Sequence, residues 1–117
     1  MINAKNYLKS YRERTGVLLQ DIAVIIGMNS GNLSKIENDK REMTLLAILG
    51  YHFTLDIPIE KLFKDHYPEV LNYSLRNSLK LKDELLDKMI TPNISHRIIL
   101  LDSIIDRLKD LGAKYGA

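Results

Sequence analysis

Cysteine is absent from this 117-residue chain, tryptophan is absent too, and no long apolar run occurs. Without cysteine there can be no disulfide bridge, thiolate zinc site or cysteine nucleophile, so packing has to stabilise the fold. No stretch approaches the roughly 20 apolar residues of a membrane-spanning helix, and the N-terminal residues contain no apolar signal segment. We therefore expect a soluble, cytoplasmic protein with no membrane partner.

Charge of one sign is also scarce, since 17 basic residues face 15 acidic ones and the net charge is +2. This surplus is too small to indicate nucleic acid by itself. Its distribution is uneven, because residues 1–41 carry +3 and the remainder carries −1. The surplus matters if folding gathers the cations on one face, and otherwise it indicates only a solvated, mixed surface.

The length allows one ordinary domain, or a small domain with an appendage, which excludes most large enzyme architectures. Isolated glycines and prolines divide the chain into short helical segments, and none has the alternating pattern of an exposed strand. The predicted fold is therefore all-α. Asn29 and Thr44 are predicted helix N-caps, and Gly16 and Gly27 are predicted helix stops. The first five helices are expected at about 4–15, 19–26, 30–37, 44–55 and 58–64.

Pro68 disfavours helix at the preceding residue, so we place a boundary there and predict two domains, 1–66 and 67–117. The second domain is predicted to be a hairpin of two helices, at about 69–90 and 92–111, with Thr91 as the cap of the second. On the first of these helices the expected apolar stripe consists of Leu71, Leu75, Leu79, Leu86 and Met89.

The last predicted helix carries a heptad-like seam. Its main residues are Ile98, Leu101, Ile105 and Leu108, preceded by Ile94. That much apolar surface needs a cover. We expect it to form a homodimer interface, with packing inside the hairpin as the alternative, and the two are compatible.

The segments at 19–26 and 30–37 are joined by a tight turn containing Gly27, which is the geometry of a helix-turn-helix motif. Around them, residues recur at fixed spacing and without insertions: Leu8, Arg12, Gly16, Ile22, Ala23, Gly27, the run 33–38, Lys40, Arg41, Leu45 and the run 59–63. In this pattern, which covers about half of the chain, the sequence resembles the helix-turn-helix domains of phage repressors and Cro proteins, the xenobiotic-response-element type. The resemblance implies a five-helix DNA-binding domain.

The resemblance also implies which residues face bases in double-stranded DNA, namely Ser30, Gly31, Asn32 and Lys35. Asparagine can bond adenine through two hydrogen bonds, lysine can donate to guanine O6 and N7, and serine is permissive. Gly31 has no side chain, so base reading is expected to be sparse. The alternative is that these residues form only a polar helix surface.

Phosphate contacts are implied for Asn29, Lys40 and Arg41. Such contacts supply affinity that is independent of sequence and falls with salt. The alternative for Lys40 and Arg41 is a pair of solvated loop charges. Gln20 is a partial substitute for a phosphate-binding glutamine that relatives carry one residue earlier.

Arg12 and Glu37 match a pair that forms a structural salt bridge in relatives. The guanidinium of a partly buried arginine needs a planar carboxylate partner, which favours this role.

Four positions depart from the family pattern. Leu18 and Leu19 stand where relatives carry a Ser or Thr cap and a glutamine, which removes about 1 kcal/mol of capping. An exposed apolar pair at this place also suits a protein-contact surface. Asp39 and Asp56 stand where glycine is commoner, and aspartate tolerates a left-handed backbone less readily.

We find no pattern that predicts an enzyme, a metal site or a cofactor. The three histidines lie in different segments, without the i, i+4 spacing of a helical metal pair. The sequence therefore predicts a DNA-binding transcriptional regulator, a dimeric repressor that reads a pseudo-palindromic operator. The alternative is a protein-interaction module, or an antitoxin, with weak affinity for DNA.

Overall fold

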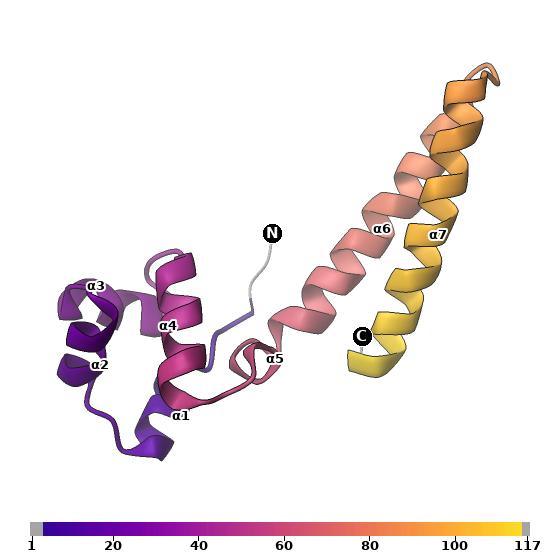
Figure 1. Cartoon of the computed structure of the whole chain (residues 1–117). Helices are drawn as coiled ribbons and strands as arrows, with labels where there is room; N and C mark the ends of the chain where they lie inside the picture. Colours follow the sequence, from indigo (N-terminus) through magenta and orange to yellow (C-terminus); the bar gives the residue numbers. More distant parts are fainter. Residues whose placement is uncertain (1–3, 116–117) are drawn as a thin grey trace. The chain divides into compact units, whose positions relative to one another are not determined.

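Apolar residues at helical spacing, closed by glycines and side-chain caps, organise the whole of residues 4–115, which are the residues that the computed structural model describes. Every regular element in that part of the chain is a helix, so the prediction of an all-α fold is confirmed. The chain divides between His66 and Tyr67 into two compact units. The first contains α1 (Leu8–Thr15), α2 (Leu19–Ile26), α3 (Ser30–Glu37), α4 (Leu45–Leu55) and α5 (Ile59–Leu62), and the second is built from α6 (His66–Leu86) and α7 (Pro92–Tyr115) (Figure 1).

Helix α4 organises the first unit, because it contacts α1, α2 and α5, while α2 also contacts α3. The close approach of α4 to α2 depends on Gly50, where an added Cβ would lie 2.6 Å from Cγ2 of Ile26. The side chains that fill this core are at most 2% exposed: Leu8, Ile22, Ala23, Leu33, Ile36, Ala47, Tyr51 and Leu62. Burial of this kind contributes about 1.5–3 kcal/mol for each large apolar side chain.

The helix ends follow local chemistry. Thr44 caps α4, because its Oγ1 accepts a hydrogen bond from the backbone N–H of Ala47 at 3.2 Å. Asp39 and Asp56 both adopt the left-handed backbone, with φ of 58° and 54°. Their positions therefore impose the conformation that glycine adopts most easily, and the two aspartates hold it at some cost in strain.

Helix α1 begins at Leu8, four residues later than expected, because Asn6 ties the preceding segment to the end of α3. The Asn6 Nδ2 donates to the carbonyl of Ile36 at 3.0 Å and to Oδ1 of Asp39 at 2.8 Å. The Asn6 Oδ1 accepts from the backbone N–H of Leu8 at 3.0 Å. The two contacts that Nδ2 makes join residues 30 and 33 positions apart, so local propensity does not reveal them.

Helix α6 begins at His66, so the prediction that Pro68 interrupts the helix is wrong. Pro68 is the third residue of α6, inside the first turn, where a backbone N–H has no partner within the helix in any case. Its missing N–H is therefore tolerated.

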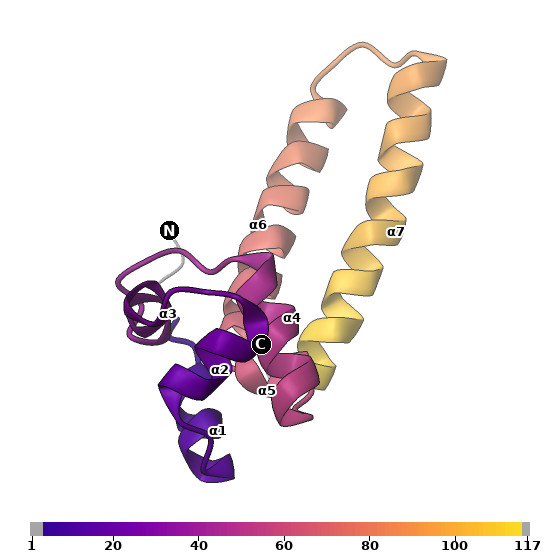
Figure 2. The ribbon, with the colours of Figure 1, turned by 60° about the vertical axis from the view of Figure 1, so that its left-hand side comes forward.

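The second unit is a hairpin in which α6 and α7 run side by side in opposite directions (Figure 2). Thr91 caps α7, since its Oγ1 accepts from the N–H of Ile94 at 3.1 Å. At the other end the rings of Tyr67 and Tyr115 meet edge to face, 5.0 Å apart. This contact lies beyond Leu111, where we expected the helix to stop, and it helps α7 continue to Tyr115.

The buried face of α6 differs from the predicted stripe. Leu85 is buried, at 1% exposure, whereas Leu79, Leu86 and Met89 are exposed. From Leu75 the inward face continues through Ser78, Lys82 and Leu85 rather than through Leu79 and Leu86. The prediction considered hydrophobicity alone, and it was wrong because the inner face includes two polar residues, Ser78 and Lys82.

Candidate nucleic-acid interface

Helices α2 and α3 contact each other and are joined by a tight turn at Gly27–Asn29. Gly27 ends α2 with φ of 75°, and its N–H bonds back to the carbonyls of the last turn. Asn29 then starts α3, because its Oδ1 accepts from the backbone N–H groups of Gly31 at 2.8 Å and Asn32 at 3.1 Å. The turn and the cap together set the direction in which α3 leaves α2.

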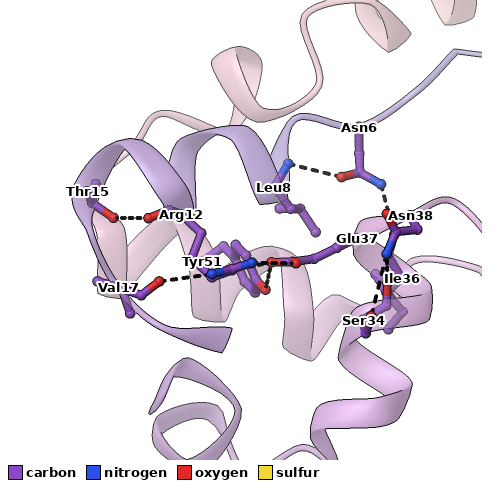
Figure 3. A network of polar contacts seen from close by, with 10 residues as sticks. All are labelled: Asn6, Leu8, Arg12, Thr15, Val17, Ser34, Ile36, Glu37, Asn38 and Tyr51. Atoms are coloured by element: carbon purple, nitrogen blue, oxygen red, sulfur yellow. Dashed lines mark hydrogen bonds and ion pairs between the residues drawn. The ribbon is translucent and has the colours of Figure 1, made fainter. Parts of the chain in front are cut away.

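A buried polar network fixes the end of α3 to α1 and α4 (Figure 3). Arg12 donates from Nε to Oε2 of Glu37 at 2.7 Å and from Nη2 to Oε1 at 3.0 Å. Its Nη1 donates to the carbonyl of Val17 at 3.0 Å. The hydroxyl of Tyr51 donates to the same Glu37 Oε2 at 2.6 Å. The carboxylate therefore satisfies partners from two helices and holds α3 in place.

Burial raises the pKa of Tyr51 far above its ordinary value of 10.0, and its hydrogen bond to Glu37 raises it further. The hydrogen bond to Glu37 is also the main reason why the pKa of Arg12 is raised. Because both pKa values are raised, Arg12 and Tyr51 stay protonated at neutral pH. Sequence reasoning found the Arg12 and Glu37 pair but missed Tyr51, which reaches Glu37 from α4.

The outward face of α3 is exposed. All four residues expected to read bases lie on it: Ser30, Gly31, Asn32 and Lys35. The residues expected to contact phosphates, Asn29, Lys40, Arg41 and Gln20, are exposed as well. Arg41 is not simply a solvated loop charge, because its Nη1 donates a hydrogen bond to Oδ1 of Asn32 at 2.8 Å.

Helix α2 begins without a side-chain cap. Leu18 occupies the N-cap position and makes no side-chain cap hydrogen bond. It is 56% exposed, and on the same helix Val24 and Ile25 are also exposed, Val24 at 81%. Apolar side chains therefore line the outer side of the helix that precedes α3.

The seam on α7 is used within the hairpin. Leu101 and Ile105 are buried, whereas Ile98 and Leu108 are partly buried. Leu101 clusters with Ile94 and with Leu85 of α6, and Ile98 packs against that cluster. The seam thus packs inside the hairpin, which was the alternative that we left open, and its use as a homodimer interface stays a prediction.

Within residues 4–115, no three His, Cys, Asp or Glu side chains are placed to hold a metal ion together. In the same part of the chain, no helix combines the length and hydropathy needed to cross a membrane. Comparisons with protein-family models, with curated proteins and with solved structures found no match.

Proposed function

We propose that the chain is a sequence-specific DNA-binding transcriptional regulator that inserts α3 into the major groove and acts in the cytoplasm. The observation that carries this proposal is the exposed polar face of α3, with Lys35 on it and Arg41 beside it, on a helix whose opposite side is fixed by Glu37. Reading base edges requires side chains held in fixed positions, and the buried network provides that support.

The residues around α3 suit the DNA backbone. Asn29 keeps its Nδ2 free of the cap that its Oδ1 makes, so this amide can donate to a phosphate. Lys40 and Arg41 follow α3 and add cationic donors, and Gln20 lies on the preceding helix. This arrangement is similar to the one that the resemblance to phage repressors and Cro proteins implies.

We further propose that the regulator is a homodimer that reads a pseudo-palindromic operator with half-sites about 34 Å apart or a multiple of that. Large apolar side chains remain exposed on the hairpin: Val70, Tyr73, Leu79, Leu81, Leu86, Met89, Ile90, Ile99, Leu100 and Ile104. They are available for a second copy. Light scattering at tens of micromolar should give twice the 13.5 kDa of one chain, and a monomer would contradict the dimer.

The experiment that tests DNA binding compares Lys35→Ala and Arg41→Ala with Lys80→Ala, an exposed α6 cation that removes the same charge. Operators are first selected from genomic fragments with the unaltered protein. Because each lost phosphate contact reduces the salt slope by about 0.9, Arg41→Ala in a dimer should flatten it by about 2. Lys35→Ala should weaken operator binding most, and Lys80→Ala should change neither quantity. Equal behaviour of all three variants would contradict the proposal.

A second candidate is a protein-interaction module or antitoxin with little affinity for DNA. The exposed Leu18, Val24 and Ile25 of the α2 region favour it. In that case the Lys35 and Arg41 variants leave any DNA binding unchanged, whereas Val24→Ser prevents a partner protein from copurifying.

A further inference from the structure

A hydrogen bond joins Arg41 to Asn32, one of the residues on the proposed reading helix. Arg41 lies in the loop after α3, and its Nη1 reaches back nine residues to Oδ1 of Asn32 at 2.8 Å. A guanidinium has five N–H donors and no acceptor, so the amide atom that it meets has to be the carbonyl oxygen. The contact therefore fixes the orientation of the Asn32 amide, with Nδ2 directed away from Arg41.

An unconstrained asparagine reads adenine because it has one acceptor and one donor. Its Oδ1 accepts from adenine N6, and its Nδ2 donates to N7. In this protein the Oδ1 of Asn32 is occupied by Arg41. An adenine amino group brought to the remaining lone pair would set its own hydrogens against those of the guanidinium, donor against donor.

We propose that Asn32 and Arg41 act as one reader that presents several donors and only one partly blocked acceptor, and that selects guanine over adenine at the base facing Asn32. Guanine offers two acceptors in the major groove, N7 and O6, whereas adenine offers one acceptor and one donor. The Nδ2 of Asn32 and the free N–H groups of Arg41 match the first pattern. This inference rests on the proposed function, and it makes Arg41 a specificity-determining residue rather than a phosphate contact alone.

The rest of the reading face supports the same selectivity. The Oδ1 of Asn29 is occupied by the backbone N–H groups of Gly31 and Asn32. Lys35 can only donate, and Gly31 has no side chain. Among the residues predicted to face bases, Ser30 alone retains an acceptor that no described contact occupies. The half-site is therefore expected to place guanines, rather than adenines, under α3.

The test selects bound sequences from a random duplex library with the full chain, for the unaltered protein and for Arg41→Ala, Asn32→Ala and Lys40→Ala. Lys40→Ala is the matched control, since it removes one charge from the same loop and leaves the donor to Asn32 in place. Binding is measured at low salt, where phosphate contacts keep weakened variants on DNA. All three positions are exposed, and circular dichroism checks that each variant is folded.

The unaltered protein should prefer guanine at one position of each half-site. Arg41→Ala frees Oδ1 of Asn32, so the ratio of guanine to adenine at that position should fall by about tenfold or more, which is within the range of a bidentate contact. Asn32→Ala should weaken the preference for guanine at that position. Lys40→Ala should lower the affinity for DNA and leave the preference for guanine unchanged.

Two failures are distinguishable. If the unaltered protein enriches specific DNA but prefers adenine or no base at the Asn32 position, or if Arg41→Ala leaves its preference unchanged, the reader proposal is wrong and DNA binding stands. If the unaltered protein enriches no sequence, both proposals are wrong.

Discussion

Replacing Arg12 with methionine tests whether the buried network holds α3 in place. The side chain of Arg12 is 10% exposed and that of Glu37 is 2% exposed. The change removes both hydrogen bonds to the Glu37 carboxylate and the one to Val17, and leaves Tyr51 as the only described donor to that carboxylate. A buried carboxylate without its cationic partner keeps its desolvation cost, while the compensating interaction is lost.

Breaking a buried ion pair in this way costs about 3–5 kcal/mol of unfolding free energy. Since a small domain is stable by about 5–15 kcal/mol, the variant should be close to the limit of folding. With a urea m-value of about 1.5 kcal/mol/M, its unfolding midpoint should fall by about 2–3 M. Circular dichroism at 222 nm follows the helices through this transition.

Two further variants isolate the network from the loss of an arginine. Arg14→Met on the same helix removes an exposed guanidinium that lies 4.9 Å from the centre of the Tyr11 ring, and should cost less than about 1 kcal/mol. Arg12→Met combined with Glu37→Gln removes both charges and keeps an acceptor for Tyr51, so it should cost less than the sum of the two single changes. Equal costs for Arg12→Met and Arg14→Met, or strict additivity in the double variant, would refute the reasoning.

Three other predictions follow from the same structure. The pKa of Tyr51 is raised above its unfolded value of about 10, so its contribution to the free energy of unfolding is complete below pH 10 and is lost as the pH rises further. Between pH 9 and 11 the free energy of unfolding should therefore fall less in Tyr51→Phe than in the unaltered protein, as measured by urea unfolding at each pH. Leu85→Ala should lower the free energy of unfolding by about 2–5 kcal/mol and Leu86→Ala by less than about 1 kcal/mol, since of the two only Leu85 is buried. Equal losses in thermal melts would show that the buried face of α6 has been assigned wrongly. Asp56→Gly should raise the unfolding free energy by about 0.5–1 kcal/mol by relieving the left-handed strain, and a lower midpoint would contradict this.

Much of the fold was predictable because it depends on neighbours in the chain. The bounds of α2, and the caps Asn29 and Thr44, follow from glycine, asparagine and threonine acting within three or four residues of themselves. Helix propensity and capping are local physical effects, so one sequence is enough to find them.

Apart from the Arg12 and Glu37 pair, which the resemblance implied, the contacts between distant residues were missed. Asn6 shortens α1 by bonding to the end of α3, and Tyr51 completes the network of Glu37 from another helix. On the hairpin, Lys82 lies on the inner side of α6 and bonds Asp102 of α7 at 2.6 Å, so a hydrophobic pattern alone misidentified the buried face.

The candidate site divides in the same way. That Asn32 and Lys35 share the exposed side of α3 follows from helical spacing. The contact of Arg41 with the side-chain oxygen of Asn32 does not follow from helical spacing, because the loop conformation brings Arg41 there. The exposure of the residues expected to contact DNA was therefore predictable, but the orientation of their side chains was not.

Protection of guanine N7 from methylation tests the central claim most directly, because N7 lies in the major groove. On a selected operator, we predict two protected patches about 10 base pairs apart or a multiple of that, one under each α3 of a dimer, and loss of protection in Lys35→Ala. Binding that leaves every guanine N7 reactive on operators with guanines in both half-sites would contradict the account, because α3 would then lie outside the groove.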